Sequence, residues 1–238
     1  MQIVILAGGL GSRLERVSGG RPKAMIEVEG VPFADHQLRM LSKQGITEVV
    51  YSVNYLGNQI EEFVGDGSRY GFKVQYVYDG ERQLGTGGAL RRVFDEGKLK
   101  NLFLVTYGDT LLQISFCELL KELEKHSTYD AVMSIYRNDD GLGESNVEQV
   151  GGGLINYDKV PGSRPFSLMT HTDYGAIAIR RSAVEALVGS ESVVDLAKIF
   201  TLMSKRGTLG SFEVFDRFYE IGTPESLMEL SSYLKNDL

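Results

Sequence analysis

The chain has 238 residues, of which 42% are apolar and 24% are charged. This is the composition of a globular protein with one sizeable core, and it excludes a chain that is disordered as a whole. A formal net charge of −7 argues against a protein whose purpose is to bind nucleic acid or a membrane surface.

The first predicted element is a short apolar run at 3–6, which ends at Gly8 and Gly9. Consecutive apolar positions are typical of a strand buried on both faces, as in a mainly parallel sheet. In chain order there follow a helix at 34–44 with Gly45 as its C-cap, a strand at 46–53, a helix at 57–65, a strand at 72–78, a helix at 86–96, a strand at 102–106 and a helix at 115–125. The alternation predicts right-handed βαβ units and a doubly wound sheet.

The second half of the chain is less regular. After a strand at 130–137, the segments 138–153 and 158–172 indicate loops around one or two short strands. A strand at 174–179, a helix at 194–205 and a strand at 208–214 follow. The last helix, which runs to about residue 234, has Thr223 as N-cap and Pro224 at its first position. We find no repeat and no linker, and therefore expect one domain.

The glycine turn after the first strand reads L-A-G-G-L-G-S-R at 6–13. Such a turn lets backbone N–H groups approach an anion, although a tight structural turn would explain three glycines equally well. Its spacing is neither that of the dinucleotide fingerprint nor that of the P-loop. Four cations follow within positions 13–23 of an acidic chain, and this favours a polyphosphate site. They are Arg13, Arg16, Arg21 and Lys23.

With R-P-K-A-M-I-E-V-E-G-V-P-F at 21–33, this turn closely resembles the signature of the sugar-phosphate nucleotidylyltransferase family. The resemblance covers most of the chain. It implies a Rossmann-like, doubly wound α/β fold with a mostly parallel, mixed sheet of the nucleotide-diphospho-sugar transferase type. The single domain, 1–238, would have a nucleotide-binding part at about 1–137, and a sugar-binding part with the C-terminal helix at 138–238.

In that family the glycine loop wraps the NTP triphosphate, while the arginine that closes it and the lysine after proline contact phosphates. The resemblance therefore implies catalytic roles for Arg13 and Lys23. The residues of the loop that match the nucleotide site are Leu6, Ala7, Gly8, Gly9, Gly11, Ser12 and Arg13.

A second glycine segment, L-G-T-G-G-A, occupies 84–89. On its own it is as compatible with a structural role as with binding. In the family the matching segment lies against the nucleobase, which implies nucleotide contacts from Gly85, Thr86 and Gly88. We expect glycine here because a side chain would fill the space of the flat base. Gln83 and Glu81 are further candidates for a hydrogen bond to the base.

Two carboxylates are candidates for a metal site. Asp109 follows the strand at 102–106, and ligands of open α/β sheets bind at the carboxyl ends of strands. Mg²⁺ prefers one or two carboxylates together with phosphate oxygens and water, although a turn-forming aspartate is the alternative. The resemblance implies that Asp109 is catalytic and binds Mg²⁺. The second family ligand is commonly aspartate, and here it is Glu220, which departs by one methylene and could equally be a surface carboxylate.

The resemblance places the sugar pocket in the central part of the chain. The family's N-x-G appears here as Asp173-Tyr174-Gly175. Asp173 could accept hydrogen bonds from sugar hydroxyls, but unlike asparagine it lacks a donor. Asn146, Glu148 and Asn54 are further sugar-binding candidates, with a solvated loop as the alternative for the first two. The full sugar-binding set is Asn54, Asn146, Glu148, Asp173 and Gly175.

The chain most resembles the compact branch of the family, and within it guanylyltransferases for heptose or mannose 1-phosphate. We therefore expect Mg²⁺, an NTP and a sugar 1-phosphate as partners in nucleotide-sugar biosynthesis, with a homo-oligomer left open. A cytidylyl- or uridylyltransferase with another phosphorylated acceptor, and a non-catalytic nucleotide-sugar sensor, are the alternatives.

The sequence also bears on location. The segment MQIVILAGG is too short and too uncharged for a signal peptide, and no run approaches the roughly 18 apolar residues of a membrane span. Cys117 is the one cysteine, which excludes an internal disulfide framework and fits a reducing compartment. We therefore expect a cytoplasmic protein.

Overall fold

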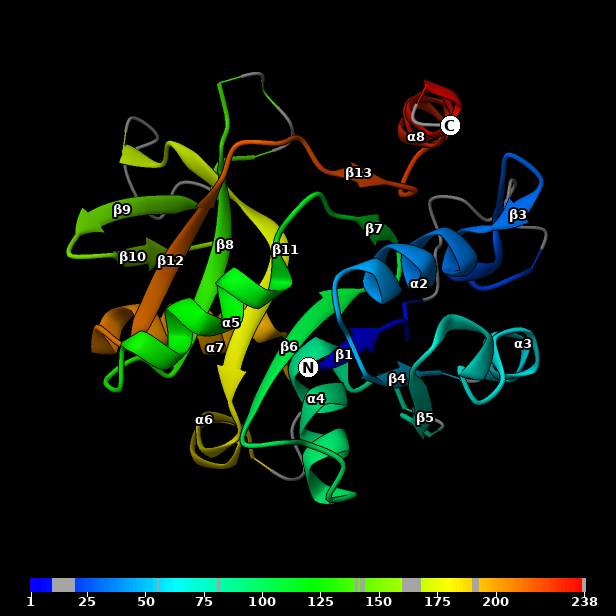
Figure 1. Ribbon diagram of the computed structural model, residues 1–238. Coiled ribbons are helices and arrows are strands. Elements are labelled where there is room, and N and C mark those ends of the chain that lie inside the picture. Colours follow the sequence, from blue (N-terminus) through cyan, green and yellow to red (C-terminus); the bar gives the residue numbers. More distant parts are fainter. Residues whose placement is uncertain are drawn as a thin grey trace.

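The structure, a computed structural model, describes residues 1–9, 20–54, 56–80, 82–139, 141, 144–159, 168–189 and 193–236. Its centre is a nine-stranded sheet with the order β5-β4-β1-β6-β11-β8-β12-β10-β9 (Figure 1). In chain order these strands are β1 (Gln2–Leu6), β4 (Glu48–Val53), β5 (Lys73–Tyr78), β6 (Leu102–Tyr107), β8 (Ala131–Arg137), β9 (Val147–Gly151), β10 (Leu154–Tyr157), β11 (His171–Arg180) and β12 (Leu209–Val214).

Strand direction divides the sheet into two regions. Strands β5, β4, β1 and β6 are parallel to one another, as in a Rossmann-like unit. Strand β11 is antiparallel to both β6 and β8, and only β8 and β12 are parallel among the later pairs of the described strands. The hairpin of β9 and β10 completes the far edge. The predicted mixed α/β sheet is confirmed, with parallel pairing concentrated in the first half.

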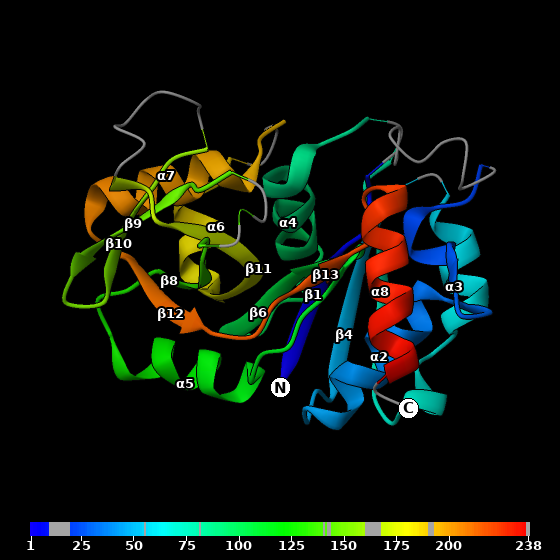
Figure 2. The same cartoon turned by 90° about the horizontal axis from the view of Figure 1, so that it is seen from above.

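Helices cover both faces of this sheet (Figure 2). One face buries apolar side chains of α2 (Phe33–Lys43), α3 (Gly57–Val64) and α5 (Phe116–Lys125). The other face buries those of α4 (Gly85–Asp95), α6 (Arg181–Leu187) and α7 (Leu196–Arg206). No helix in the described part of the chain is long and apolar enough to cross a membrane.

The central strand β1 explains the unbroken apolar run in the sequence. Ile3 and Ile5 belong to the core on the side of α2, whereas Val4 and Leu6 belong to the core on the side of α4. Successive side chains of a strand point to opposite faces, so a strand covered on both faces must be apolar at every position. All five residues of β1 are buried.

The C-terminal helix α8 (Pro224–Asn236) starts where the sequence predicts. The Oγ1 of Thr223 accepts a hydrogen bond from the N–H of Ser226 at 3.1 Å, which confirms the N-cap. The helix contributes Leu230 to a third apolar cluster, which includes Val28 and Ile221. It is therefore packed against the small hairpin of β2 (Glu27–Val28) and β3 (Val31–Pro32).

The second half departs from the sequence prediction in three places. The helix α6 was not expected, the hairpin of β9 and β10 lies partly in the predicted loop at 138–153, and β11 begins three residues earlier than predicted. Two short strands, β7 (Thr110–Leu111) and β13 (Tyr219–Glu220), pair across a long sequence separation. Their patterns are too short for periodicity to identify, because pairing with distant segments and not local sequence fixes them.

Candidate functional site

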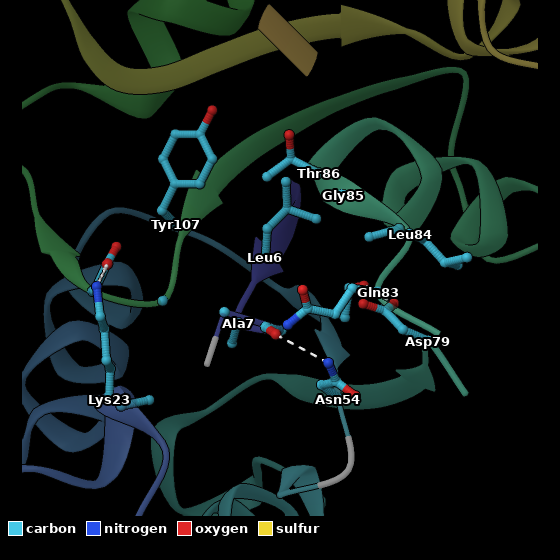
Figure 3. A pocket seen from close by; sticks show the side chains of 17 residues that line it. Leu6, Ala7, Lys23, Asn54, Asp79, Gln83, Leu84, Gly85, Thr86 and Tyr107 are labelled. Atoms are coloured by element: carbon cyan, nitrogen blue, oxygen red, sulfur yellow. Dashed lines mark hydrogen bonds and ion pairs between the residues drawn. The ribbon is translucent and has the colours of Figure 1, made fainter. Parts of the chain in front are cut away.

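A pocket of about 510 Å³ opens at the carboxyl ends of the parallel strands. Figure 3 shows side chains converging on it from the ends of β1, β4, β5 and β6 and from the start of α4. Open α/β sheets bind their ligands at this edge. The described residues that line it are Leu6, Ala7, Gly8, Gly9, Lys23, Ala24, Ser52, Asn54, Asp79, Gln83, Leu84, Gly85, Thr86, Ala89, Tyr107, Gly108 and Asp109.

The start of the glycine turn is held between two neighbouring strand ends. The N–H of Ala7 donates to the carbonyl oxygen of Ser52 at 2.8 Å, and the N–H of Gly108 donates to that of Leu6 at 3.0 Å. The predicted nucleotide residues 6–9 all line the pocket. Gly11, Ser12 and Arg13 lie outside the described residues.

Asn54 belongs to this same turn. Its Nδ2 donates to the carbonyl oxygen of Gly8 at 3.3 Å, and its side chain lines the pocket beside the turn (Figure 3). From the sequence, Asn54 is predicted at the rim of the sugar pocket. The structure places it where it orients the backbone of the glycine turn.

Lys23 and Asp109 form an ion pair at one side of the pocket. The distance from Nζ of Lys23 to Oδ2 of Asp109 is 2.8 Å, and the two side chains are 23% and 30% exposed. Lys23 begins a short 3₁₀ turn directly after the buried Pro22, and the buried Ala24 fixes that turn against the core. The predicted phosphate-binding cation and the predicted metal-binding carboxylate are therefore neighbours.

Glu220 is brought to the same place by the pairing of β13 with β7. Glu220 lies opposite Thr110 in this ladder, and the N–H of Ile221 donates to the carbonyl oxygen of Asp109 at 3.0 Å. Two candidate ligands far apart in sequence thus lie close together, Glu220 on β13 and Asp109 in the turn directly before β7. Among the described residues no cluster of three or more His, Cys, Asp or Glu side chains is placed to hold a metal ion.

A buried glutamine supports this arrangement and was missed in the sequence. Gln37 of α2 is 1% exposed, and its Nε2 donates to the carbonyl oxygens of Tyr107 and Thr110, at 2.8 Å each. These two bonds fix the turn that presents Asp109. A polar residue on the buried face of a predicted helix is the feature that could have identified it.

The second glycine segment opens α4, and the structure gives a different reason for its glycines from the one expected. Gly85 has a φ of +70°, and a Cβ on it would lie 2.7 Å from the carbonyl oxygen of Val194. A Cβ on Gly87 would lie 2.9 Å from the Val194 side chain. Packing against residue 194 therefore requires glycine at both positions, whatever occupies the pocket.

The backbone of Val194 and Leu196 also forms hydrogen bonds with the polar groups of this segment. The N–H groups of Gly87 and Gly88 donate to the carbonyl oxygen of Val194 at 2.8 and 3.2 Å. The hydroxyl of Thr86 accepts from the N–H of Leu196 at 2.8 Å. Gly85 and Thr86 line the pocket, whereas Gly88 is buried two residues further into the helix.

Asp79 is the pocket carboxylate that the sequence analysis missed. It is 6% exposed, and its Oδ1 accepts a hydrogen bond from Ser52 Oγ at 3.1 Å. Burial raises the pKa of Asp79 to about 6. It directly follows β5, as Asp109 follows β6 by two residues, and this position at the carboxyl end of a strand could have identified it. Of the two base-binding candidates, Gln83 lines the pocket and Glu81 lies outside the described residues.

The predicted sugar residues fall into two groups. Oδ1 of Asn146 accepts from the N–H of Asp173 at 2.9 Å, and Oδ1 of Asp173 accepts from the N–H of Gly175 at 3.0 Å. These three therefore form one constellation, where β11 shows an irregular register and Gly175 has a φ of +100°. Glu148 lies on the hairpin of β9 and β10, where Oε2 accepts from Asn156 at 2.9 Å.

Tyr107 is another pocket residue that the sequence did not predict. It lies near both Asp109 and the constellation of Asp173. Its ring lines the pocket (Figure 3), and burial raises its pKa well above the usual range, with further contributions from the charges of Asp173, Asp195 and Asp109. Burial also raises the pKa of Asp173 to about 6. A Cβ on Gly175 would lie 3.8 Å from Cδ2 of Tyr107, and Asp109 follows Tyr107 by two residues, so the Asp173 constellation and Asp109 both lie near this side chain.

Comparison with known proteins identifies relatives of this chain. The family described as MobA-like NTP transferase domain matches residues 3–192. A D-glycero-alpha-D-manno-heptose 1-phosphate guanylyltransferase of Aneurinibacillus thermoaerophilus is 35% identical over 136 residues, which cover 57% of this chain and 56% of that protein. A mannose-1-phosphate guanylyltransferase of Mycobacterium tuberculosis is 26% identical over 97% of this chain and 64% of its own length. The chain therefore spans between about half and two thirds of these curated relatives.

Solved structures share the fold. HddC from Yersinia pseudotuberculosis, also solved in complex with GMP-PN, aligns with a TM-score of 0.80 at 24% identity, over 98% of this chain and 99% of that one. The inositol-1-phosphate CTP transferase of T. maritima aligns with a TM-score of 0.77 at 19% identity, over 98% of this chain and 96% of that one. At these identities the likeness confirms the predicted nucleotide-diphospho-sugar transferase type of fold.

The raised pKa of Asp79 predicts a pH-dependent effect on stability. A carboxyl group whose pKa is higher in the folded state stabilises the fold below its unfolded pKa, and this contribution is lost as the pH rises through the folded pKa. Asp79→Asn should therefore raise the free energy of unfolding at pH 7.5 by up to roughly 3 kcal/mol relative to the wild type, and by much less at pH 4. Urea titrations of both proteins across this range measure the difference; a difference that is constant with pH would contradict the prediction.

Proposed function

Because the chain belongs to the MobA-like NTP transferase domain family, we propose that it transfers a nucleotidyl group from GTP to a sugar 1-phosphate. A phosphate oxygen of the sugar phosphate attacks the α-phosphorus, the bond between the α- and β-phosphates breaks, and pyrophosphate leaves. Heptose and mannose 1-phosphates are the proposed acceptors, since relatives of this chain are named for both. The observation that carries the proposal is the pairing of Lys23 with Asp109 beside a glycine turn, in one pocket.

The nucleotide binds between the glycine turn and the start of α4. Backbone N–H groups of the turn, supported by Asn54 and the end of β4, face the triphosphate. Arg13, outside the described residues, and Lys23 bind the phosphates in this proposal, and they stabilise the charge of the departing pyrophosphate. A pocket of about 510 Å³ is within the usual size range for small-molecule sites.

Asp109 and Glu220 fit a Mg²⁺ site in their donor chemistry. The carboxylate of Glu220 on β13 and that of Asp109 in the turn before β7 could supply one or two protein ligands to such an ion. When bound, Mg²⁺ neutralises phosphate charge and holds the two reacting anions in register. Lys23 already neutralises Asp109 in the described structure, and it is free to turn to a phosphate once another cation takes its place.

No general base is needed, because a sugar phosphate is already an anionic nucleophile near neutral pH. Acceleration must then come from positioning two polyanions in line and from neutralising their charge. We place the sugar against Tyr107 and the constellation of Asp173, Asn146 and Gly175. Asp173 accepts hydrogen bonds from sugar hydroxyls, and Glu148 contributes from the hairpin edge. The chain acts as one catalytic domain, in the cytoplasm.

The direct test is pyrophosphate release from the purified protein with Mg²⁺, with the four common NTPs crossed against a panel of sugar 1-phosphates. We expect release only when GTP and a heptose or mannose 1-phosphate are present together. Release with CTP or UTP and another phosphorylated acceptor would contradict the guanylyl assignment and retain the reaction class. GTP binding without release across the panel would contradict the enzyme and support a nucleotide-sugar sensor.

Asp109→Asn is expected to reduce kcat by about 100-fold or more, because it removes a charge from the group that organises the phosphates. The matched control is Asp95→Asn at the far end of α4, a side chain that is 42% exposed and paired only within its own helix. Circular dichroism and thermal unfolding should show both variants folded. Unchanged turnover in Asp109→Asn would remove this carboxylate from the mechanism.

Glu220 is tested by a series that separates charge from length. Glu220→Asp should retain activity, since aspartate is the residue that the family resemblance expects there. Glu220→Ala should raise the Mg²⁺ concentration for half-maximal activity by about 10-fold or more. Mg²⁺ titrations of the two variants distinguish them. An alanine variant with the wild-type Mg²⁺ dependence would assign Glu220 to the fold alone.

A further inference from the structure

Gln37 does not line the pocket, yet its buried amide holds the turn that carries Asp109. The residue lies on the buried face of α2, which passes beside β7 (Figure 1), and it is 1% exposed. Its Nε2 carries two hydrogens and donates to the carbonyl oxygens of Tyr107 and Thr110, at 2.8 Å each. These two carbonyls stand on either side of Gly108 and Asp109, so a single amide group holds both ends of the turn.

The oxygen of this amide has no partner of its own. Oε1 of Gln37 is buried, and within the part of the chain that the structure describes it accepts no hydrogen bond. Turning the amide over would bring Oε1 against the two carbonyl oxygens, which are acceptors as well. A buried acceptor without a donor costs free energy, and an apolar side chain of similar length would avoid this cost. What glutamine provides here, and an apolar side chain cannot, is the pair of donors at the turn.

The middle of the turn is held from the other side by β1. The N–H of Gly108 donates to the carbonyl oxygen of Leu6 at 3.0 Å, and a Cβ on Gly108 would lie 2.7 Å from the Cβ of Ala7. The turn therefore lies directly against the end of β1. The contact with β1 holds Gly108, whereas the bonds from Gln37 hold the residues on either side of Gly108 and Asp109.

From Thr110 the same constraint reaches Glu220. Thr110 lies opposite Glu220 in the ladder of β7 and β13, and the N–H of Ile221 donates to the carbonyl oxygen of Asp109 at 3.0 Å. Each of these strands has two residues, and so short a ladder has few bonds of its own. The place of β13, and with it that of Glu220, therefore depends on the turn that Gln37 fixes.

Two carboxylates bind one cation well only if they are held at a fixed separation, and losing a group that orients a ligand typically weakens metal affinity or activity by about 10- to 100-fold. We propose that Gln37 is a positioning residue, which sets the separation of Asp109 and Glu220 and thereby the affinity of this corner of the pocket for a divalent cation. The inference rests on the proposed function, in which these two carboxylates bind Mg²⁺, and it adds the group that holds them in place.

Gln37→Met tests the positioning without any ligand. Methionine is of similar length and a good helix former, and it removes both donors together with the unpartnered acceptor. Amide hydrogen exchange followed by NMR should show the N–H of Ile221 exchanging about 10-fold faster or more. The N–H of Asp79, bonded to Val53 on the other side of the pocket, should keep its wild-type rate. Equal acceleration at both amides, or an unchanged rate at Ile221, would overturn the proposal.

A kinetic readout separates metal binding from nucleotide binding. Gln37→Met should raise the Mg²⁺ concentration for half-maximal activity by about 10-fold or more, and leave the KM for GTP at saturating Mg²⁺ within about 3-fold of the wild type. Gln44→Met, at the C-cap of the same helix and outside the pocket, is the matched control and should match the wild type in both. A Gln37→Met variant with the wild-type Mg²⁺ dependence would overturn the proposal while nucleotidyl transfer stands. If no NTP is turned over, the proposed reaction fails, and the hydrogen-exchange comparison still decides whether Gln37 positions the turn.

Gln37→Glu guards against a methionine variant that fails to fold. Glutamic acid has the shape of glutamine, and burial favours its uncharged form, which can donate to only one of the two carbonyl oxygens. The Mg²⁺ concentration for half-maximal activity should therefore exceed that of the wild type by about 3-fold or more, and stay below that of Gln37→Met where this variant folds. A glutamic acid variant with the wild-type Mg²⁺ dependence and the wild-type exchange rate at Ile221 would overturn the proposal.

Discussion

The site depends on the parallel pairing of β1 with β4 on one side and β6 on the other. Parallel strands end at the same edge, so the residues that follow each strand are brought together without any specific contact between them. Residues 7–9 follow β1, Asn54 follows β4 and Asp109 follows β6. Asp79 follows β5, which is parallel to β4. The pairing holds because β1 is apolar from Ile3 to Leu6 and its two faces are covered by helices. A polar substitution inside β1 would therefore disturb the core on one face and the geometry of the pocket together.

A second constraint is charge. If the chain binds an NTP and a sugar 1-phosphate, as proposed, a protein with a net charge of −7 must accommodate two polyanions, and its pocket carboxylates lie among compensating groups. Asp109 is neutralised by Lys23, and Asp173 is hydrogen-bonded to backbone N–H of Gly175. Asp79 has the hydroxyl of Ser52 as a hydrogen-bond donor and the charge of Arg92 nearby, and burial outweighs both and raises its pKa. The three carboxylates thus differ in the nearest group that compensates their charge, which is a lysine for Asp109, a backbone N–H for Asp173 and a hydroxyl for Asp79.

The sequence predicted those features that depend on local pattern or on a long motif. Periodicity located the parallel strands and most helices, and the cap at Thr223 located the last helix; the motif at 6–13 and 21–33 identified the family. The short strands β7 and β13 could not be predicted, because their pairing is decided by contacts between residues more than a hundred positions apart. Asp79 was overlooked because one aspartate after a strand is locally a turn residue; its place at the carboxyl end of a strand is a signal in the sequence, and its burial is visible only in the structure. The assigned roles of Arg13, Glu220 and the sugar residues stay predictions.

The contact between Val194 and the start of α4 has a consequence for where anions can bind. The first N–H groups of a helix have no partner within the helix, and for that reason helix N-termini often bind phosphate. Here the carbonyl oxygen of Val194 accepts from Gly87 and Gly88, and Thr86 is engaged with the backbone of Leu196. Two of the first N–H groups of α4 are thereby occupied by protein and not by a ligand. An anion in the pocket therefore finds its backbone donors in the glycine turn after β1 and not at Gly87 and Gly88 of this helix.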